Sequence, residues 1–299
     1  MNLFDLLGHY GPCTGAELLD LAGVEVFSLW KACCMEPHVV MRRVGRRYLR
    51  LDKSVDGYAR LSPSIRREFL TYTVVGLADQ AGEMTARCLE LEREFARISE
   101  QKRQLAYEVI RRIVESSPNR EQLCAHACYL IAGDVTYGMA HSVERFEPST
   151  GRPVQGSDLD VVIVSDEELT ALEREELDAA IYRKKWYMLA MPQIREEIDY
   201  VVKDMVRVRS QLAFDTFRHM IACKILQESE LLYGSEHIFA RIKRLVEESD
   251  IPRKLARLEE SAIRERGEAE RQLVELPAAA CTPACQHLFF TDEEREEIC

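Results

Sequence analysis

The sequence predicts an α+β (mixed) protein in which a β-sheet is flanked by helices. The middle of the chain holds three apolar runs typical of strands, 126–134, 157–164 and 196–208. Long segments before and after them are rich in Glu, Arg, Gln and Ala and have helical apolar spacing. The N-terminal region also contains a short stretch in which apolar and basic residues alternate, as in a β-hairpin.

Composition limits the classes of protein to consider. The chain has 299 residues, 46% of them hydrophobic and 30% charged, which is ordinary for a globular protein. No apolar run reaches the ~20 residues that span a bilayer, and the N-terminus does not read as a secretory signal, so we expect a cytoplasmic protein with no membrane partner. The net charge is −11, which disfavours general nucleic-acid binding without a local basic patch or a bound metal.

Residues 1–75 are expected to form the first domain. Segments 2–11, 14–23 and 25–37 read as short helices, and Thr14 with Glu17 predicts a capping box at the second. Residues 38–52 alternate apolar and basic side chains about Gly45, which predicts a two-stranded hairpin.

These elements together resemble a winged helix-turn-helix domain with a basic wing. The wing could contact the phosphates of a nucleic acid, or it could be a solvated hairpin on a scaffold domain. Both interpretations stay open. The candidate nucleic-acid contacts are Arg42, Arg43, Arg46 and Arg47.

Residues 76–118 are predicted to be a long helical connector. Its apolar residues recur at alternating spacings of four and three, as in a heptad seam, with Lys102 interrupting it. The seam should pack on another helix, either in the same chain or in a second copy as a homodimer. The seam residues are Met84, Cys88, Leu91, Phe95, Ile98, Leu105 and Val109.

Residues 119–208 hold the candidate catalytic carboxylates. Asp158 and Asp160 are two residues apart at the start of an apolar strand, so their side chains point to one face. Two like charges this close are unfavourable unless a cation neutralises them, and Mg²⁺ or Mn²⁺ prefers carboxylate oxygens. Asp199, within the third apolar run, could complete the metal site. The alternative is that Asp158 and Asp160 only cap a turn.

Three motifs in this region resemble the polymerase-beta-like nucleotidyltransferase superfamily. The motifs are LIAGDVTYG (130–138), GSDLDVVIV (156–164) and EIDYVV (197–202), and the similarity covers roughly residues 120–245. The resemblance implies a mixed sheet flanked by helices, with the three aspartates as catalytic residues and metal ligands. It also implies nucleotide contacts from Gly133, Asp134, Gly138, Gly156, Ser157 and Lys224.

Two features depart from the superfamily pattern. Asp134 stands where Ser or Gly is usual, and a carboxylate there would repel a triphosphate unless it turns away or binds metal. The spacer 139–155 between the first two motifs is also long. Residues 209–299 are expected to form a helical subdomain with an acidic tail.

The resemblance implies metal-dependent transfer of a nucleoside monophosphate from an NTP, expected to be ATP, to a hydroxyl acceptor, with release of pyrophosphate. The acceptor could be RNA, a protein or a small molecule. The alternative is a nucleotide sensor or DNA-bound regulator whose core no longer turns over. Zinc at the cysteine pairs 124/128 and 281/285 is disfavoured by their spacing.

Overall fold

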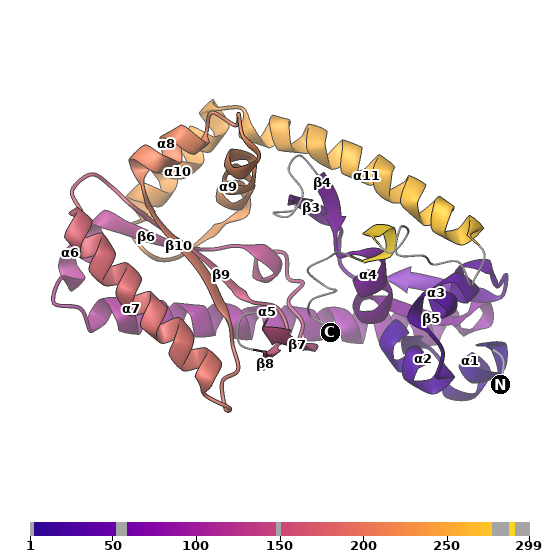
Figure 1. The fold of residues 1–299 in the computed structure, drawn as a ribbon. Coiled ribbons are helices and arrows are strands. Elements are labelled where there is room, and N and C mark those ends of the chain that lie inside the picture. The colour runs from indigo at the N-terminus through magenta and orange to yellow at the C-terminus, as the bar shows by residue number, and fades with distance from the viewer. Residues whose placement is uncertain (1–2, 52–58, 148–150, 277–286, 291–299) are drawn as a thin grey trace. The chain divides into compact units, whose positions relative to one another are not determined.

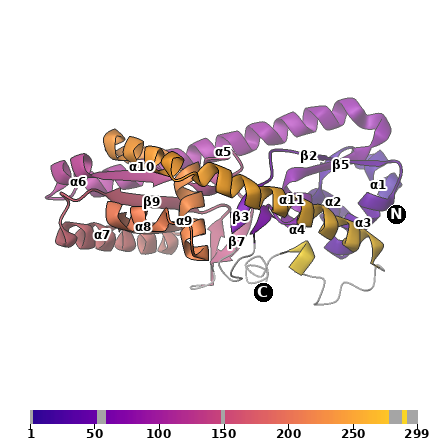
Figure 2. The same cartoon turned by 90° about the horizontal axis from the view of Figure 1, so that it is seen from above.

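The computed structural model describes residues 3–51, 59–147, 151–276 and 287–290. The chain divides into two compact units. Unit 1 comprises Met1–Arg50, Ala59–Phe95 and Leu258–Cys299, and unit 2 comprises Leu51–Tyr58 and Ala96–Arg257. The expected α+β composition is confirmed (Figure 1 and, seen from above, Figure 2). The two units differ from the four predicted segments, because the last part of the chain belongs with the first.

The N-terminal helices lie where the sequence predicted them. The side-chain oxygen of Thr14 accepts the Glu17 N–H, and the Glu17 carboxylate accepts the Thr14 N–H at 2.7 Å, which completes the predicted capping box. The helices before residue 80 are α1 (Leu3–Tyr10), α2 (Gly15–Ala22), α3 (Val26–Met35) and α4 (Ile65–Tyr72). The strands are β1 (Cys13–Thr14), β2 (Val39–Arg43), β3 (Tyr48–Leu51), β4 (Ala59–Ser62) and β5 (Thr73–Leu77).

The predicted hairpin about Gly45 is wrong. Strand β2 pairs antiparallel with β5, in a sheet of order β1-β5-β2, and β3 pairs with β4 instead. All five residues of β5 are buried, so β5 gives β2 a more apolar partner than β3 could. Val44, directly after β2, is buried and donates its N–H to the Tyr72 carbonyl at 2.7 Å, which directs the chain away from a tight turn.

Arg42 and Arg47, which belong to the candidate wing, make contacts within unit 1. Arg42 donates to the Thr85 hydroxyl at 2.8 Å. Arg47 donates to both carboxylate oxygens of Glu68, at 2.7 and 2.6 Å, and to Glu270 at 2.6 Å. These guanidinium groups are therefore not simply solvated. Nucleic-acid binding by the four arginines stays a prediction.

The C-terminal segments complete the apolar core of unit 1. Leu273 in α11 (Ile251–Glu275) is fully buried among residues of α1–α4. The ring of Phe289 lies 5.3 Å from that of Phe27 and 5.4 Å from that of Trp30, measured between centroids. This packing explains why residues 258–299 belong to unit 1. The predicted acidic tail at 291–299 and the cysteine pair at 281/285 lie outside the described residues.

The long helix is confirmed as α5 (Ala81–Glu115). Most of its predicted seam is already buried within the chain, including Leu91, Phe95 and Ile98, and Phe95 packs on Tyr72 at a ring-centroid distance of 4.9 Å. Lys102 is buried in the seam because it pairs with a carboxylate of unit 2, as described below. The homodimer predicted through this seam stays a prediction.

Unit 2 is built on a four-stranded mixed sheet of order β10-β9-β6-β11. Strands β9 and β10 are parallel, whereas β6 is antiparallel to both β9 and β11. The strands of the unit are β6 (Ala127–Ile131), β7 (Glu144–Glu147), β8 (Arg152–Gln155), β9 (Leu159–Ser165), β10 (Ile198–Asp204) and β11 (Glu230–Gly234). Its helices are α6 (Arg120–His126), α7 (Ala171–Ala190), α8 (Met205–Gln211), α9 (Phe217–Glu228) and α10 (Glu236–Glu248).

Two predictions about these elements were wrong. Residues 209–234 were expected to be entirely helical, but 230–234 form β11 on the edge of the sheet, where it pairs with the fully buried β6. The third predicted strand ends at Asp204, whose carboxylate caps α8 by accepting the Arg207 N–H at 2.8 Å. Within the described residues, no helix is long and apolar enough to cross a bilayer.

Candidate functional site

Two of the three predicted aspartates lie on neighbouring parallel strands of unit 2, and the third directly precedes one of these strands. Asp160 and Asp199 are the second residues of β9 and β10 and stand opposite each other in the ladder. Leu159 and Ile198, which precede them, are buried in the core that includes α7. Side chains alternate along a strand, so Asp160 and Asp199 point to the other face of the sheet. Asp158 directly precedes β9.

Gly133 leaves room for the Asp160 carboxylate. It has a φ of 67°, and a Cβ built there would lie 2.0 Å from Asp160 Oδ2. A side chain at this position would be both strained and in collision. The first glycine of the LIAGDVTYG motif is therefore required by the close approach of a carboxylate. Gly138 also has a positive φ, 66°, but its Cβ position is open.

The Gly-Ser turn is held against the loop before β7. At Gly156, with a φ of 61°, a Cβ would lie 1.6 Å from the His141 carbonyl oxygen. Ser157 donates its N–H to the same carbonyl at 3.1 Å. The Ser157 hydroxyl also donates to Asp134 Oδ2 at 2.7 Å. Asp134, the departure from the superfamily pattern, is thus bound to the serine of the second motif.

Negative charge concentrates around Asp160. Part of its side chain remains exposed, but protein atoms crowd it closely, and this desolvation raises its pKa well above the ordinary value. The charges of Asp158, Asp199, Asp134 and Glu228 raise the pKa further, in that order. The site therefore favours a proton or another cation at Asp160.

Arg145 supplies part of the compensating positive charge. This residue, on β7, donates to Glu197 at 2.8 Å and to the Gly156 carbonyl at 2.9 Å, and it lies 3.9 Å from Asp158. Burial raises the pKa of Glu197, and the charge of Arg145 opposes that rise. The long spacer between the first two motifs thus contributes a residue that positions the Gly-Ser turn.

Glu228 at the end of α9 is a further part of the site that the sequence interpretation missed. Its side chain is only 4% exposed. It accepts the Gly133 N–H at 3.4 Å and the Tyr137 hydroxyl, and it pairs with Lys224 at 2.5 Å. Lys224 was predicted to reach a triphosphate, but here it lies in an ion pair one helical turn from Glu228. The four-residue spacing of Lys224 and Glu228 in the sequence is the pattern that could have predicted this ion pair.

A cavity of about 530 Å³ opens beside Asp160 and Asp199. Its apolar wall comes from α9 and includes Phe217 and Ile221. Basic residues from β10, α8 and α9 also line it. They are Lys203, Arg207 and Arg218. The cavity has the size of a small-molecule site and combines an apolar wall with carboxylates and cations.

The three basic side chains of this cavity differ in burial and in hydrogen bonding. Lys203 is buried and donates to Gln211 at 2.9 Å. Its burial, and after that the charge of Arg207, lower its pKa to about 8. The side chains of Arg207 and Arg218 are exposed and form no hydrogen bond or ion pair with any described residue. Lys203 lies four residues after Asp199 in β10, so strand alternation puts it on the same face, whereas Arg218 gave no sequence signal.

A buried ion pair supports the segment before β10. Lys102 of α5 donates to Glu196 at 2.6 Å and to the Gln155 carbonyl at 2.9 Å. It therefore ties α5 to the residues before Asp199 and to the end of β8. The sequence marked Lys102 as an interruption of the seam, but its partner, 94 residues away, could not be identified from spacing.

The described part of the chain contains no complete set of metal ligands. Nowhere there do three or more His, Cys, Asp or Glu side chains lie together as ligands for an ion. The three aspartates are therefore brought close without being arranged as a complete ligand set. Cys124 and Cys128 are free thiols in α6 and β6, and burial raises the pKa of Cys128 to about 12.

Comparison with known proteins does not assign this chain to a family. No protein-family model, curated protein or solved structure matches this chain at a significant level. The likeness to the nucleotidyltransferase superfamily therefore rests on the residues of the chain itself.

Proposed function

We propose that unit 2 is a metal-dependent nucleotidyltransferase that moves a nucleoside monophosphate from an NTP, with ATP expected, to a hydroxyl acceptor. The observation that supports this most directly is the in-register pair Asp160 and Asp199 beside Gly133, in a site where desolvation and then the neighbouring charges raise the pKa of Asp160. Perturbed carboxylates at the edge of a cavity are typical of functional sites.

The donors at the site fit Mg²⁺ or Mn²⁺ in their chemistry. Asp158, Asp160 and Asp199 offer carboxylate oxygens, and the mutual repulsion that raises the pKa of Asp160 is the repulsion a divalent cation would relieve. These three residues would hold the ion. When bound, it would supply neutralisation of phosphate charge during the transfer.

The residues of the cavity have separate roles in this proposal. Phe217 and the apolar wall of α9 pack against the base, while Arg207 and Arg218 bind phosphate oxygens. The acceptor oxygen forms a bond to the α-phosphorus as the bond to pyrophosphate breaks, and a carboxylate oxygen of Asp199 accepts the hydroxyl proton. Pyrophosphate leaves with the displaced electron pair.

The test is to incubate the protein with NTPs labelled in the α-phosphate, Mg²⁺ or Mn²⁺ and a cell extract, and to follow label transfer and pyrophosphate release. Asp160→Asn and Asp199→Asn should each lower both by at least ~100-fold. The matched control is Asp250→Asn, since Asp250 is exposed in unit 2 and asparagine tolerates its φ of 55°. Equal transfer by the parent and both site variants would refute the mechanism.

One observation favours a second candidate, a nucleotide sensor that binds without turnover. Asp134 accepts a hydrogen bond from the Ser157 hydroxyl, so the serine of the second motif is bound by a carboxylate that the superfamily pattern lacks. The sensor interpretation is supported if the parent binds NTP with Mg²⁺ but releases no pyrophosphate with any acceptor, while Asp134→Ser does release pyrophosphate. A DNA-bound form of this regulator stays untested, because it depends on the wing arginines.

A further inference from the structure

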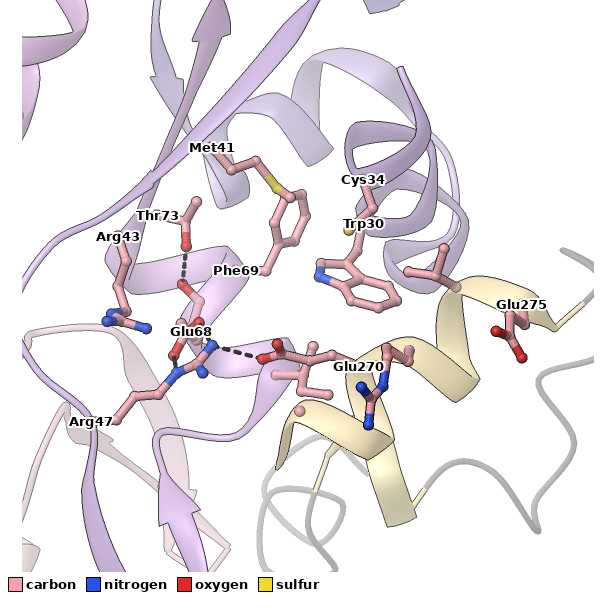
Figure 3. Close-up of a pocket in the computed structure, with 14 residues that line it drawn as sticks. Trp30, Cys34, Met41, Arg43, Arg47, Glu68, Phe69, Thr73, Glu270 and Glu275 are labelled. Atoms are coloured by element: carbon pink, nitrogen blue, oxygen red, sulfur yellow. Dashed lines mark hydrogen bonds and ion pairs between the residues drawn. The ribbon is translucent and has the colours of Figure 1, made fainter. Parts of the chain in front are cut away.

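Unit 1 contains a second cavity, of about 550 Å³, that is unrelated to the aspartate site (Figure 3). It lies between α3, β2, α4 and the last turns of α11. Its apolar surface includes Trp30, Met41 and Phe69, so two aromatic rings face one concave space. Cavities of this size with aromatic walls commonly hold small molecules.

The charged groups across this cavity form a closed network. Arg47 contacts Glu68 and Glu270, each at 2.6 Å. Arg266 lies 3.5 Å from Glu68 and 2.8 Å from Glu270. Two guanidinium groups and two carboxylates thus neutralise one another. Arg47, Glu68 and Glu270 of this network line the cavity, and the network as a whole carries no net charge.

The remaining polar groups are mainly donors. Arg43 and Arg271 line the cavity, are exposed, and form no hydrogen bond or ion pair with any described residue. The indole N–H of Trp30 likewise has no partner among the described residues, and Figure 3 shows the nitrogen facing toward Phe69. Glu275 is the one further carboxylate among the lining residues, so the charge outside the network is positive.

We propose that this cavity binds a small planar organic anion of the aromatic carboxylate type. The ring packs between Trp30 and Phe69, and the carboxylate accepts hydrogen bonds from Arg43 and Arg271. Arginine is suited to this contact because its planar guanidinium can donate two parallel hydrogen bonds to one carboxylate. The site does not depend on the nucleotidyltransferase proposal.

Trp30 provides a direct optical probe. The chain has only two tryptophans, and Trp186 of unit 2 is 39% exposed, so Trp186→Phe leaves Trp30 as the single reporter. This variant is titrated with benzoate, 4-phenylbutyrate and indole-3-propionate, following Trp30 fluorescence for the first two and calorimetry for all three. At least one acid should bind saturably, and its neutral amide should bind at least ~10-fold more weakly. Equal binding of acid and amide would contradict the anion assignment.

Two sets of variants locate the site. Arg43→Ala with Arg271→Ala should weaken binding by at least ~10-fold. Arg93→Ala, an exposed arginine of unit 1 that does not line the cavity, should leave it unchanged. Unchanged affinity in the double variant would contradict the role of the two arginines.

Gly267 allows the cavity to be filled without destabilising the fold. It lies in α11 and lines the cavity, and a Cβ there meets no atom within 4 Å. Gly267→Leu should abolish binding while the melting temperature holds or rises, because leucine favours helix over glycine by roughly 0.8 kcal/mol. Gly82→Leu, at the similarly open helical Gly82 away from the cavity, should retain binding. If no acid binds the parent, or if Gly267→Leu binds as well as the parent, the proposal is wrong.

Discussion

Asp160→Asn should stabilise the metal-free protein at any pH at which Asp160 of the parent is ionised, although it removes a residue proposed to be catalytic. The substitution is nearly isosteric and exchanges a charged oxygen for a neutral amide. The Asp160 carboxyl has a raised pKa, caused first by desolvation and then by the charges of Asp158, Asp199, Asp134 and Glu228. The parent therefore has an unfavourable charge here that the variant lacks.

The magnitude follows from the spacing of the strands. Asp160 and Asp199 are opposite each other on adjacent strands, which lie ~4.8 Å apart. Two unit charges ~5 Å apart repel by about 3 kcal/mol at an effective dielectric constant of ~20. Partial exposure and salt reduce this, so we expect a gain of roughly 1–2 kcal/mol in the free energy of unfolding. For a unit of this size the melting temperature should rise by roughly 5 °C.

The pH dependence of the free energy of unfolding is an independent check on the sign of this predicted change in stability. A carboxyl with a raised folded-state pKa stabilises the fold when protonated, and this contribution is lost as pH rises through that pKa. The advantage of Asp160→Asn should therefore increase as pH rises through the folded-state pKa of Asp160 and disappear as pH falls toward the ordinary carboxyl range. Thermal unfolding of parent, variant and Asp250→Asn in EDTA, from pH 4 to 8, measures it.

Mg²⁺ with an NTP should reverse the order of stability. Ligand at ~100 times its Kd stabilises a protein by about 2.7 kcal/mol, and the parent should gain this while Asp160→Asn gains little. A variant whose stability relative to the parent does not increase with pH in EDTA would refute the charge argument. A variant that gains as much from Mg²⁺ and NTP as the parent would refute the cation-binding role.

Three further substitutions test other parts of unit 2. Lys203→Met should be more stable than the parent at pH 7, because burial lowers the pKa of Lys203 to about 8 and the parent therefore holds an unfavourable buried charge at pH 7. The variant should lose this advantage as pH rises from about 8 past 10, and melting curves at pH 7, 8, 9 and 10 check this. Lys102→Met should cost roughly 3–5 kcal/mol in urea unfolding by leaving Glu196 buried and unpaired, whereas the double variant with Glu196→Leu should recover most of the loss. Gly133→Ala should cost about 1–3 kcal/mol through its positive φ and also weaken NTP binding in calorimetry, because its Cβ would displace the Asp160 carboxylate.

Local chemistry was sufficient to predict most of the helices and the central strands. The capping box at Thr14, the long helix 81–115 and the strand after Ser157 follow from side-chain periodicity and capping, which act between residues a few positions apart. The placement of Asp158 and Asp160 at the start of a buried strand was likewise visible. These features depend on neighbours in the chain, so the sequence alone determined them.

The partners of these elements were decided by tertiary structure. Strand β2 pairs with β5 and not with β3, because the fully buried β5 offers a better apolar partner than the adjacent segment. Residues 230–234 have a helical neighbourhood in sequence, but the unpaired edge of β6 makes them a strand. Burial and backbone pairing across 30 or more residues overrode local propensity in both cases.

The features of the candidate site can likewise be separated into those set by the local sequence and those set by the tertiary structure. The sequence determined which strand carries the carboxylates, since alternation and a glycine turn are local properties. Only the fold brought Glu228 against Gly133, and Arg145 against the Gly-Ser turn. Charges interact through space at a few ångströms whatever their separation along the chain. The raised pKa of Asp160 therefore exists only once the sheet has formed.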